Sequence, residues 1–278
     1  MNLPDLFSVI RLKISLKNVV QYNLLPKFVL QKTETSPMSI KKHIPNLITL
    51  LNLLSGCIAL VFAFQEQFEM AFYFVCLGIF FDFFDGFFAR LYHVSSPLGL
   101  QLDSLADMVT SGVVPGTVMY FMLSNALRSP EIACWNPDFW VACLGFLITL
   151  GSCYRLANFN IDTRQSDSFI GLPTPANALF ILSLPLVIQY SNSLILLEVL
   201  TNTYVLLAIT LLSVYLLNAE IPLFSLKIKN FSLQKYALQI GFVCYSIVIL
   251  IFLRYLAVPL IILSYVLLSL MHTRFSKR

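Results

Sequence analysis

Four aspartates stand close together in a strongly apolar part of the sequence: Asp82, Asp85, Asp103 and Asp107. They are half of the aspartates in the chain, and apolar runs flank or contain them. An ionised carboxylate at the centre of a bilayer costs at least about 2.5–3.5 kcal/mol, so four of them in one short stretch need a compensating charge. Carboxylate oxygens are hard ligands that suit Mg²⁺, Mn²⁺ or Ca²⁺. The residue types therefore predict a site for divalent cations.

The spacing of the four aspartates places them on the faces of two helices. The first two are three residues apart, and Gly86 and Ala89 continue the same stripe. The last two are four residues apart, and Gly99 precedes them by one turn. Two neighbouring helices can thus direct all four carboxylates to one point, where they would hold one ion or a close pair. The three small residues leave room for a bulky ligand or let the helices approach closely.

Arg90 directly follows the first pair of aspartates and the small residues beside them. Its guanidinium could pair with an aspartate, bind a phosphate group or extend to the membrane interface. The residue types leave these three roles open.

The elements that carry these residues are long apolar segments. Of the 278 residues, 58% are hydrophobic and 12% are charged, against about 25% charged in an average soluble domain. A spanning helix needs about 20 residues. The segments close to that length are 44–64, 70–91, 99–124, 138–154, 173–190, 194–217, 237–253 and 255–271. We expect an all-α, polytopic membrane protein with about eight transmembrane helices, six in a core and two after it.

The lysines and arginines predict how these segments are oriented. If the N-terminus is cytoplasmic and eight spans alternate, Arg128 and Arg254 are the only basic residues on the outer side. Because Lys and Arg favour the cytoplasmic side, we expect both termini to be cytoplasmic. The four aspartates then lie near the cytoplasmic face. Arg254 alone separates the last two segments, which favours a tight hairpin there. The net charge of +4 is too small to indicate a nucleic-acid partner.

The chain divides into three parts by composition. Residues 1–37 contain short apolar patches broken by Lys, Arg and Pro, and no clean run of spanning length. They are either a cytoplasmic arm on the membrane surface or an upstream extension, with Met38 as the working start. Residues 38–217 form the expected six-helix core, and residues 218–278 a cytoplasmic loop and a helix pair.

The aspartate stretch reads D-x2-D-G-x2-A-R-x8-G-x3-D-x3-D from Asp82 to Asp107. This resembles the signature of the CDP-alcohol phosphatidyltransferase family at every fixed position. The resemblance implies a site for CDP-diacylglycerol at Mg²⁺ or Mn²⁺, with two ions in a close pair, and a homodimer. It implies that the four aspartates bind metal, with Asp107 also the general base. It further implies that Gly86, Ala89 and Gly99 line the nucleotide pocket, supported by Arg90.

Other stretches resemble the phosphatidylserine synthase branch of that family, which implies L-serine as the acceptor. They are HIPNLITLLNLLSG (43–56), YRLANFN (154–160), FIGLPTPANA (169–178) and IPLFSLK (221–227). In the first, Thr49, Asn52 and Gly56 form a polar stripe that should face protein, water or ligand. We place Asn46, Thr49 and Asn52 among the candidate substrate-binding residues.

Arg155, in the second of these stretches, is the candidate for an anionic group of a substrate, either the serine carboxylate or a lipid phosphate. It could also be a plain positive charge on the cytoplasmic side. Asn158 occupies a position where an arginine is usual, so the sequence departs from this branch there.

Two other functions remain open from the sequence. The same chemistry could serve glycerol 3-phosphate or inositol phosphate, although a phosphorylated acceptor would need more cationic residues than this chain offers. A cation transporter would also use intramembrane carboxylates. It should carry acidic residues along a path to both faces, whereas the four aspartates cluster near one predicted face.

Overall fold

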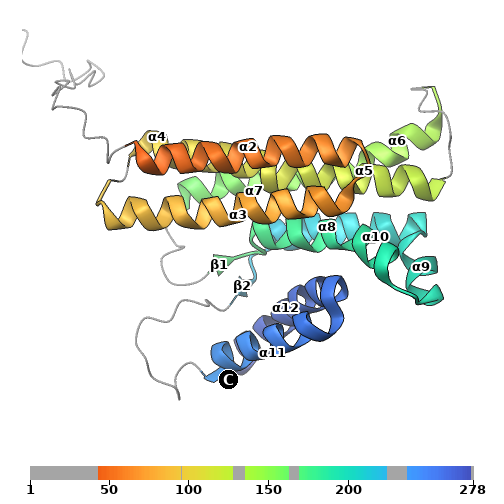
Figure 1. Cartoon of the computed structure of the whole chain (residues 1–278). Helices are drawn as coiled ribbons and strands as arrows, with labels where there is room; N and C mark the ends of the chain where they lie inside the picture. Colours follow the sequence, from red (N-terminus) through yellow and green to blue (C-terminus); the bar gives the residue numbers. More distant parts are fainter. Residues whose placement is uncertain (1–42, 95, 128–134, 163–168, 224–236, 277–278) are drawn as a thin grey trace, which may run out of the picture. The chain divides into compact units, whose positions relative to one another are not determined.

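The computed structural model describes residues 43–94, 96–127, 135–162, 169–223 and 237–276 (Figure 1). The expectations for residues 1–37 and for Met38 lie outside these ranges. The described part is almost entirely helical, which confirms the all-α prediction. In chain order the helices are α2 (Ile44–Phe64), α3 (Phe68–Leu91), α4 (Pro97–Asp107), the π-helical turn η3 (Met108–Val113), α5 (Val114–Leu127), α6 (Pro137–Cys143), η4 (Leu144–Phe146), α7 (Leu147–Ile161), α8 (Thr174–Tyr190), α9 (Leu194–Leu200), α10 (Thr203–Asn218), α11 (Ala237–Leu253), η5 (Arg254–Leu256) and α12 (Ala257–Ser276).

By length and composition, four helical stretches of the described residues could cross a membrane: Ile44–Phe64, Phe68–Leu91, Pro137–Ile161 and Gln239–Met271. The last of these includes α11, η5 and most of α12. The pair α9 and α10 makes a fifth if it is one span, bent by 68°. Helix α8 is apolar but shorter, and α4, η3 and α5 follow one another without a break. Each expected segment therefore coincides with helical structure, while the count of eight spans stays a prediction.

Several helix starts follow from local sequence. Ser96 caps α4, because its side-chain oxygen accepts a hydrogen bond from the backbone N–H of Gly99 at 3.0 Å, and Pro97 occupies the first turn. Asn202 caps α10 in the same way by accepting from the backbone N–H of Tyr204 at 2.9 Å. The cap at Asn202 marks the break that bends α9 against α10.

Close contact between α2, α3 and η3 forms the part of the core that supports the aspartates. A Cβ on Gly56 would lie 2.4 Å from the Oγ1 atom of Thr110, and one on Gly78 would lie 2.7 Å from its Cγ2 atom. Glycine at both positions lets Thr110 of the π-helical turn pack closely against the two long helices. Such π-helical turns are often found at functional sites.

Two short strands join two of the sequence stretches singled out above. Strand β1 (Phe169–Ile170) pairs antiparallel with β2 (Pro222–Leu223), in the register Phe169 with Leu223. Gly171 follows with a φ of +73°, and a Cβ there would lie 2.6 Å from the carbonyl oxygen of Leu217. The pairing brings the start of α8 against the end of α10.

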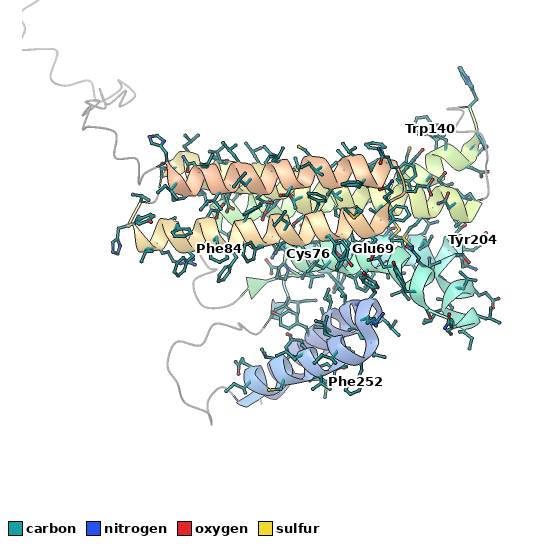
Figure 2. The ribbon with its side chains drawn as sticks, in the orientation of Figure 1. Glu69, Cys76, Phe84, Trp140, Tyr204 and Phe252 are labelled. Carbon is teal, nitrogen blue, oxygen red and sulfur yellow. The ribbon has the colours of Figure 1, made fainter. Side chains whose placement is uncertain are left out.

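The last two helices form the expected hairpin. Arg254 has a φ of +47° at the turn, and the rings of Phe242 in α11 and Tyr265 in α12 lie 5.7 Å apart. The hairpin packs on α8 through η5 and α12. Large apolar side chains stand on the outside of the helices, as Phe252 does at 78% exposure (Figure 2). An apolar outer surface of this kind suits contact with lipid.

Candidate metal and substrate site

Three of the four aspartates meet between α3 and α4. Asp82, Asp85 and Asp103 each offer a carboxylate oxygen, and these three atoms lie within 4.8 Å of one another. Asp82 and Asp85 are brought together by one turn of α3, and the capped start of α4 directs Asp103 toward them. The Oδ1 atom of Asp103 is buried and has no hydrogen-bond partner in the described part of the chain. Three carboxylates, one of them with an oxygen that has no partner, suit a divalent cation, which would offset their mutual repulsion.

Asp107, the last residue of α4, is not one of these three, but it lies close enough for its charge to repel that of Asp82. Its Oδ1 atom accepts a hydrogen bond from the Nδ2 atom of Asn52 at 3.1 Å. The structure therefore brings three of the predicted ligands together and orients the fourth through α2. The role of Asp107 as a further metal ligand stays a prediction.

The polar stripe of α2 makes hydrogen bonds between helices. The Thr49 hydroxyl is 2.5 Å from Asp85 Oδ2 and 3.0 Å from the carbonyl oxygen of Pro45. The Thr110 hydroxyl donates to Asn52 Oδ1 at 2.9 Å, so the amide nitrogen of Asn52 is free to donate to Asp107. This part of the stripe faces protein, one of the three surroundings expected from the sequence.

A pocket of about 180 Å³ opens beside the three aspartates. Its lining residues come from α2, α3, α4 and the segment before α4: Pro45, Asn46, Thr49, Asp85, Gly86, Ala89, Val94, Ser96, Gly99, Leu100 and Asp103. A Cβ on Gly86 would meet only the Arg90 side chain, at 3.7 Å, so this wall is open. A volume of about 180 Å³ is below the range of about 300–1,000 Å³ for whole ligands. The pocket would therefore accept part of a larger substrate.

Most of the predicted substrate-binding residues line this pocket, and the exceptions are Asn52, Arg90 and Arg155. Asn46, Thr49, Gly86, Ala89 and Gly99 line it. Asn52 is fully buried behind it, and Arg90 is exposed at its edge.

Arg155 of α7 does not line this pocket and is buried near Asp107. It is only 8% exposed, and its Nη2 atom donates to the carbonyl oxygen of Gly171 at 3.4 Å. The guanidinium is close enough to Asp107 for their opposite charges to attract. Its Nε atom is buried with no partner among the described residues. A buried guanidinium with spare donors can receive an anionic group.

Two further polar residues were not among the predicted site residues. Asn160 exchanges hydrogen bonds with Ser104, at 2.9 and 3.2 Å, and so ties α7 to the helix that carries Asp103. Asn177 of α8 is fully buried, and neither of its amide atoms has a partner in the described part of the chain. The sequence could have identified Asn177, because an amide within an apolar helix needs a hydrogen-bond partner in a membrane.

Comparison with known proteins agrees with this geometry. Residues 42–215 match the family model of the CDP-alcohol phosphatidyltransferases. The chain is 31% identical over 212 residues to a CDP-diacylglycerol–serine O-phosphatidyltransferase of Helicobacter pylori, covering 76% of this chain and 81% of the relative. It is 34% identical to the Bacillus subtilis enzyme of that name, covering 48% of this chain and 70% of the relative. It is 32% identical to the Saccharomyces cerevisiae enzyme of that name, covering 51% of this chain and 53% of the relative.

The family is one of membrane phosphotransferases, so the transporter interpretation is set aside. Its members use divalent metal ions, and the cluster of three aspartates lies within the matched residues. The apolar helices and the match together identify an integral membrane enzyme. The chain belongs to the CDP-alcohol phosphatidyltransferase family.

Proposed function

We propose that this enzyme transfers the phosphatidyl group of CDP-diacylglycerol to L-serine and releases CMP. The observation that carries the proposal is the group of three carboxylates within 4.8 Å beside a small pocket. The names of the relatives support serine as the acceptor. The alternative acceptors are glycerol 3-phosphate and inositol phosphate.

Asp82, Asp85 and Asp103, together with Asp107, would hold one or two Mg²⁺ or Mn²⁺ ions. A bound ion would neutralise charge on the pyrophosphate oxygens of the substrate. Thr49 steadies one of these carboxylates by donating to Asp85. The open wall at Gly86 would admit the nucleotide, with Ala89 and Gly99 beside it, and Asn46 supplies a polar group there.

Asp107 is the proposed general base. The serine oxygen forms a bond to the phosphorus of the phosphatidyl group, the bond from that phosphorus to the CMP oxygen breaks, and the hydroxyl proton passes to a carboxylate oxygen of Asp107. Such proton transfer contributes typically about 10²–10⁴-fold to a rate. Asn52 binds Oδ1 of Asp107 and thereby orients the other oxygen, Oδ2.

Arg155 is proposed to bind the carboxylate of serine. Its buried position, its attraction to Asp107 and its unpartnered Nε atom support this role. Arg90 at the exposed edge would contact a phosphate of the lipid substrate.

The acceptor is tested by measuring CMP release from CDP-diacylglycerol by the purified protein with Mn²⁺. The assay compares L-serine, glycerol 3-phosphate, inositol phosphate and no acceptor. Release that depends on serine supports the proposal. Release with a phosphorylated acceptor alone would reject serine and keep the family chemistry.

We further propose that the site and both termini face the cytoplasm and that the protein is a homodimer. The distribution of Lys and Arg supports the orientation. A C-terminal reporter that fluoresces only in the cytoplasm should be bright, and a dark reporter would reject the orientation. The mass of the detergent-solubilised particle tests the dimer, and a monomer mass would reject it.

A further inference from the structure

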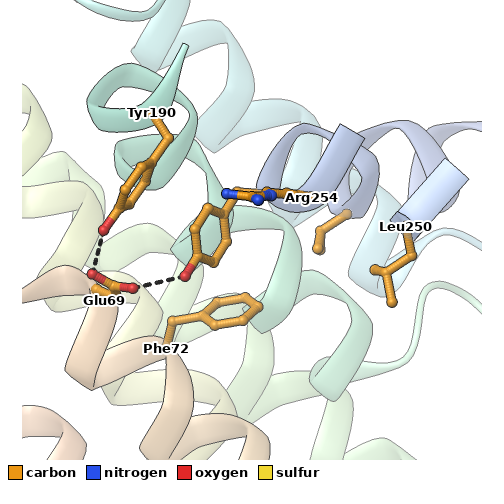
Figure 3. Close-up of a pocket in the computed structure, with 7 residues that line it drawn as sticks. Glu69, Phe72, Tyr190, Leu250 and Arg254 are labelled. Carbon is orange, nitrogen blue, oxygen red and sulfur yellow. Dashed lines mark hydrogen bonds between the residues drawn. The ribbon is translucent and has the colours of Figure 1, made fainter. Parts of the chain in front are cut away.

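A second pocket, of about 460 Å³, is shown in Figure 3. Its lining residues are Glu69, Phe72, Tyr190, Leu250, Arg254, Tyr255 and Val258. Glu69 precedes Asp82 by 13 residues on the same helix, which corresponds to about 20 Å along its axis. None of these seven residues lines the pocket beside the aspartates.

Three tyrosines fix the acidic wall of this second pocket. Glu69 Oε1 accepts hydrogen bonds from the hydroxyls of Tyr73 at 3.0 Å and Tyr255 at 2.7 Å. Glu69 Oε2 accepts one from Tyr190 at 2.5 Å (Figure 3). A carboxylate has about four lone-pair sites, so Oε2 can accept one more donor. The tyrosines come from α3, α8 and η5. They fix the Glu69 carboxylate on the pocket wall, where it can still accept a hydrogen bond from a ligand.

Arg254 supplies the basic wall. Its φ of +47° is a conformation that glycine or asparagine adopts more easily, so the turn itself does not require arginine. The side chain is exposed, and within the described ranges its guanidinium makes no hydrogen bond or ion pair. A guanidinium stays charged and offers donors in a geometry that matches a phosphate group.

The space between these charges is apolar and opens to the outer surface of the helices. Phe72, Leu250 and Val258 line it, and Leu250 is 51% exposed. A turn between two apolar helices is expected at the membrane interface, at the level of lipid headgroups. The pocket thus offers a cation, an anion and an apolar wall in the place where a phospholipid has the matching groups.

We propose that this pocket binds a zwitterionic membrane phospholipid that carries a primary ammonium group. Its phosphate contacts Arg254, its ammonium contacts Glu69 Oε2, and an acyl chain lies along Leu250 and Val258. A phospholipid with an uncharged glycerol headgroup leaves Glu69 without a cation. Charge complementarity therefore favours the ammonium lipid.

The test is native mass spectrometry of the full chain in detergent, with phosphatidylethanolamine or phosphatidylglycerol of identical acyl chains. The wild-type protein should retain the ethanolamine lipid several-fold more than the glycerol lipid. Arg254→Gln should lose that retention. Glu198→Gln is the matched control, because Glu198 is an exposed carboxylate in α9 outside the pocket, and it should behave as wild type.

A second variant keeps both charges and fills the space. Leu250→Trp adds bulk at an exposed lining position and should also lower retention of the ethanolamine lipid. If Arg254→Gln does not give a monodisperse protein, Leu250→Trp decides the question. Equal retention of the two lipids by the wild type would overturn the proposal, as would unchanged retention in the folded variants.

Discussion

At the scale of single residues, the site depends on side chains of α2 that orient carboxylates on other helices. Thr49 is bonded to Asp85, and Asn52 links Asp107 to Thr110. The sequence identified these polar residues because amides and hydroxyls are unusual in an apolar helix. It could not say which carboxylate each one contacts, because that depends on how α2 rotates against α3 and η3.

Replacing Asp107 by asparagine should remove the proposed base without changing the size of the side chain. We expect CMP release to fall at least about 100-fold, since general-base catalysis contributes about 10²–10⁴-fold. The melting temperature should not fall. Glu198→Gln removes an exposed carboxylate of α9 and should keep full activity. Wild-type turnover in Asp107→Asn would rule out its role as base.

Thr49→Val should weaken metal binding while preserving the shape of α2. The variant loses the hydroxyl that donates to Asp85, and loss of such supporting contacts typically costs about 10–100-fold in metal affinity. The Mn²⁺ concentration for half-maximal activity should rise by about that factor. Thr49→Ser keeps the hydroxyl and should stay near the wild-type value. An unchanged Mn²⁺ requirement in Thr49→Val would show that the contact does not support metal binding.

At the scale of elements, the sequence predicted where the helices lie more completely than how they are joined. Apolar runs located each helical stretch, and Arg254 marked the hairpin. The π-helical turn Met108–Val113 and the pairing of β1 with β2 were not predicted. Both depend on contacts between distant segments, such as Thr110 with Asn52, which no local pattern reports.

The close packing of α2, α3 and η3 can be tested at Gly78. A Cβ there would lie 2.7 Å from Thr110 Cγ2 and 2.8 Å from Asn52 Oδ1. Gly78→Ala should therefore destabilise the protein by about 1–3 kcal/mol, the usual cost of overpacking. The measurement is the thermal unfolding midpoint. Gly241→Ala is the control, because a Cβ at Gly241 has nothing within 4 Å, and its midpoint should not fall. Equal midpoints for the two variants would contradict the packing.

At the scale of the whole molecule, the C-terminal hairpin lies beyond the residues that match the family, 42–215. It joins the matched helices through α8 and through the hydrogen bond from Tyr255 to Glu69. The division into a six-helix core of residues 38–217 and a C-terminal part of residues 218–278 stays a prediction. The cluster of Glu69 with three tyrosines was not predicted, because Tyr73, Tyr190 and Tyr255 are far apart along the chain.

Tyr255→Phe should loosen the attachment of this hairpin. The variant removes the hydroxyl that donates to Glu69 and leaves the ring in place against Phe72. We expect a lower melting temperature and faster amide exchange in α11 and α12. Tyr204→Phe is the matched control, because Tyr204 is 83% exposed and lies outside the cluster. Exchange rates unchanged from the wild type in Tyr255→Phe would show that this contact does not attach the hairpin.

The central claim is a metal-dependent transfer of a phosphatidyl group to serine at the aspartate cluster. The most direct test follows labelled L-serine into lipid with purified protein, CDP-diacylglycerol and Mn²⁺. We predict incorporation into phosphatidylserine that is lost with EDTA, restored by added Mn²⁺, and absent in Asp103→Asn. Release of CMP without labelled lipid, or incorporation that is unaffected by EDTA and by Asp103→Asn, would contradict the claim.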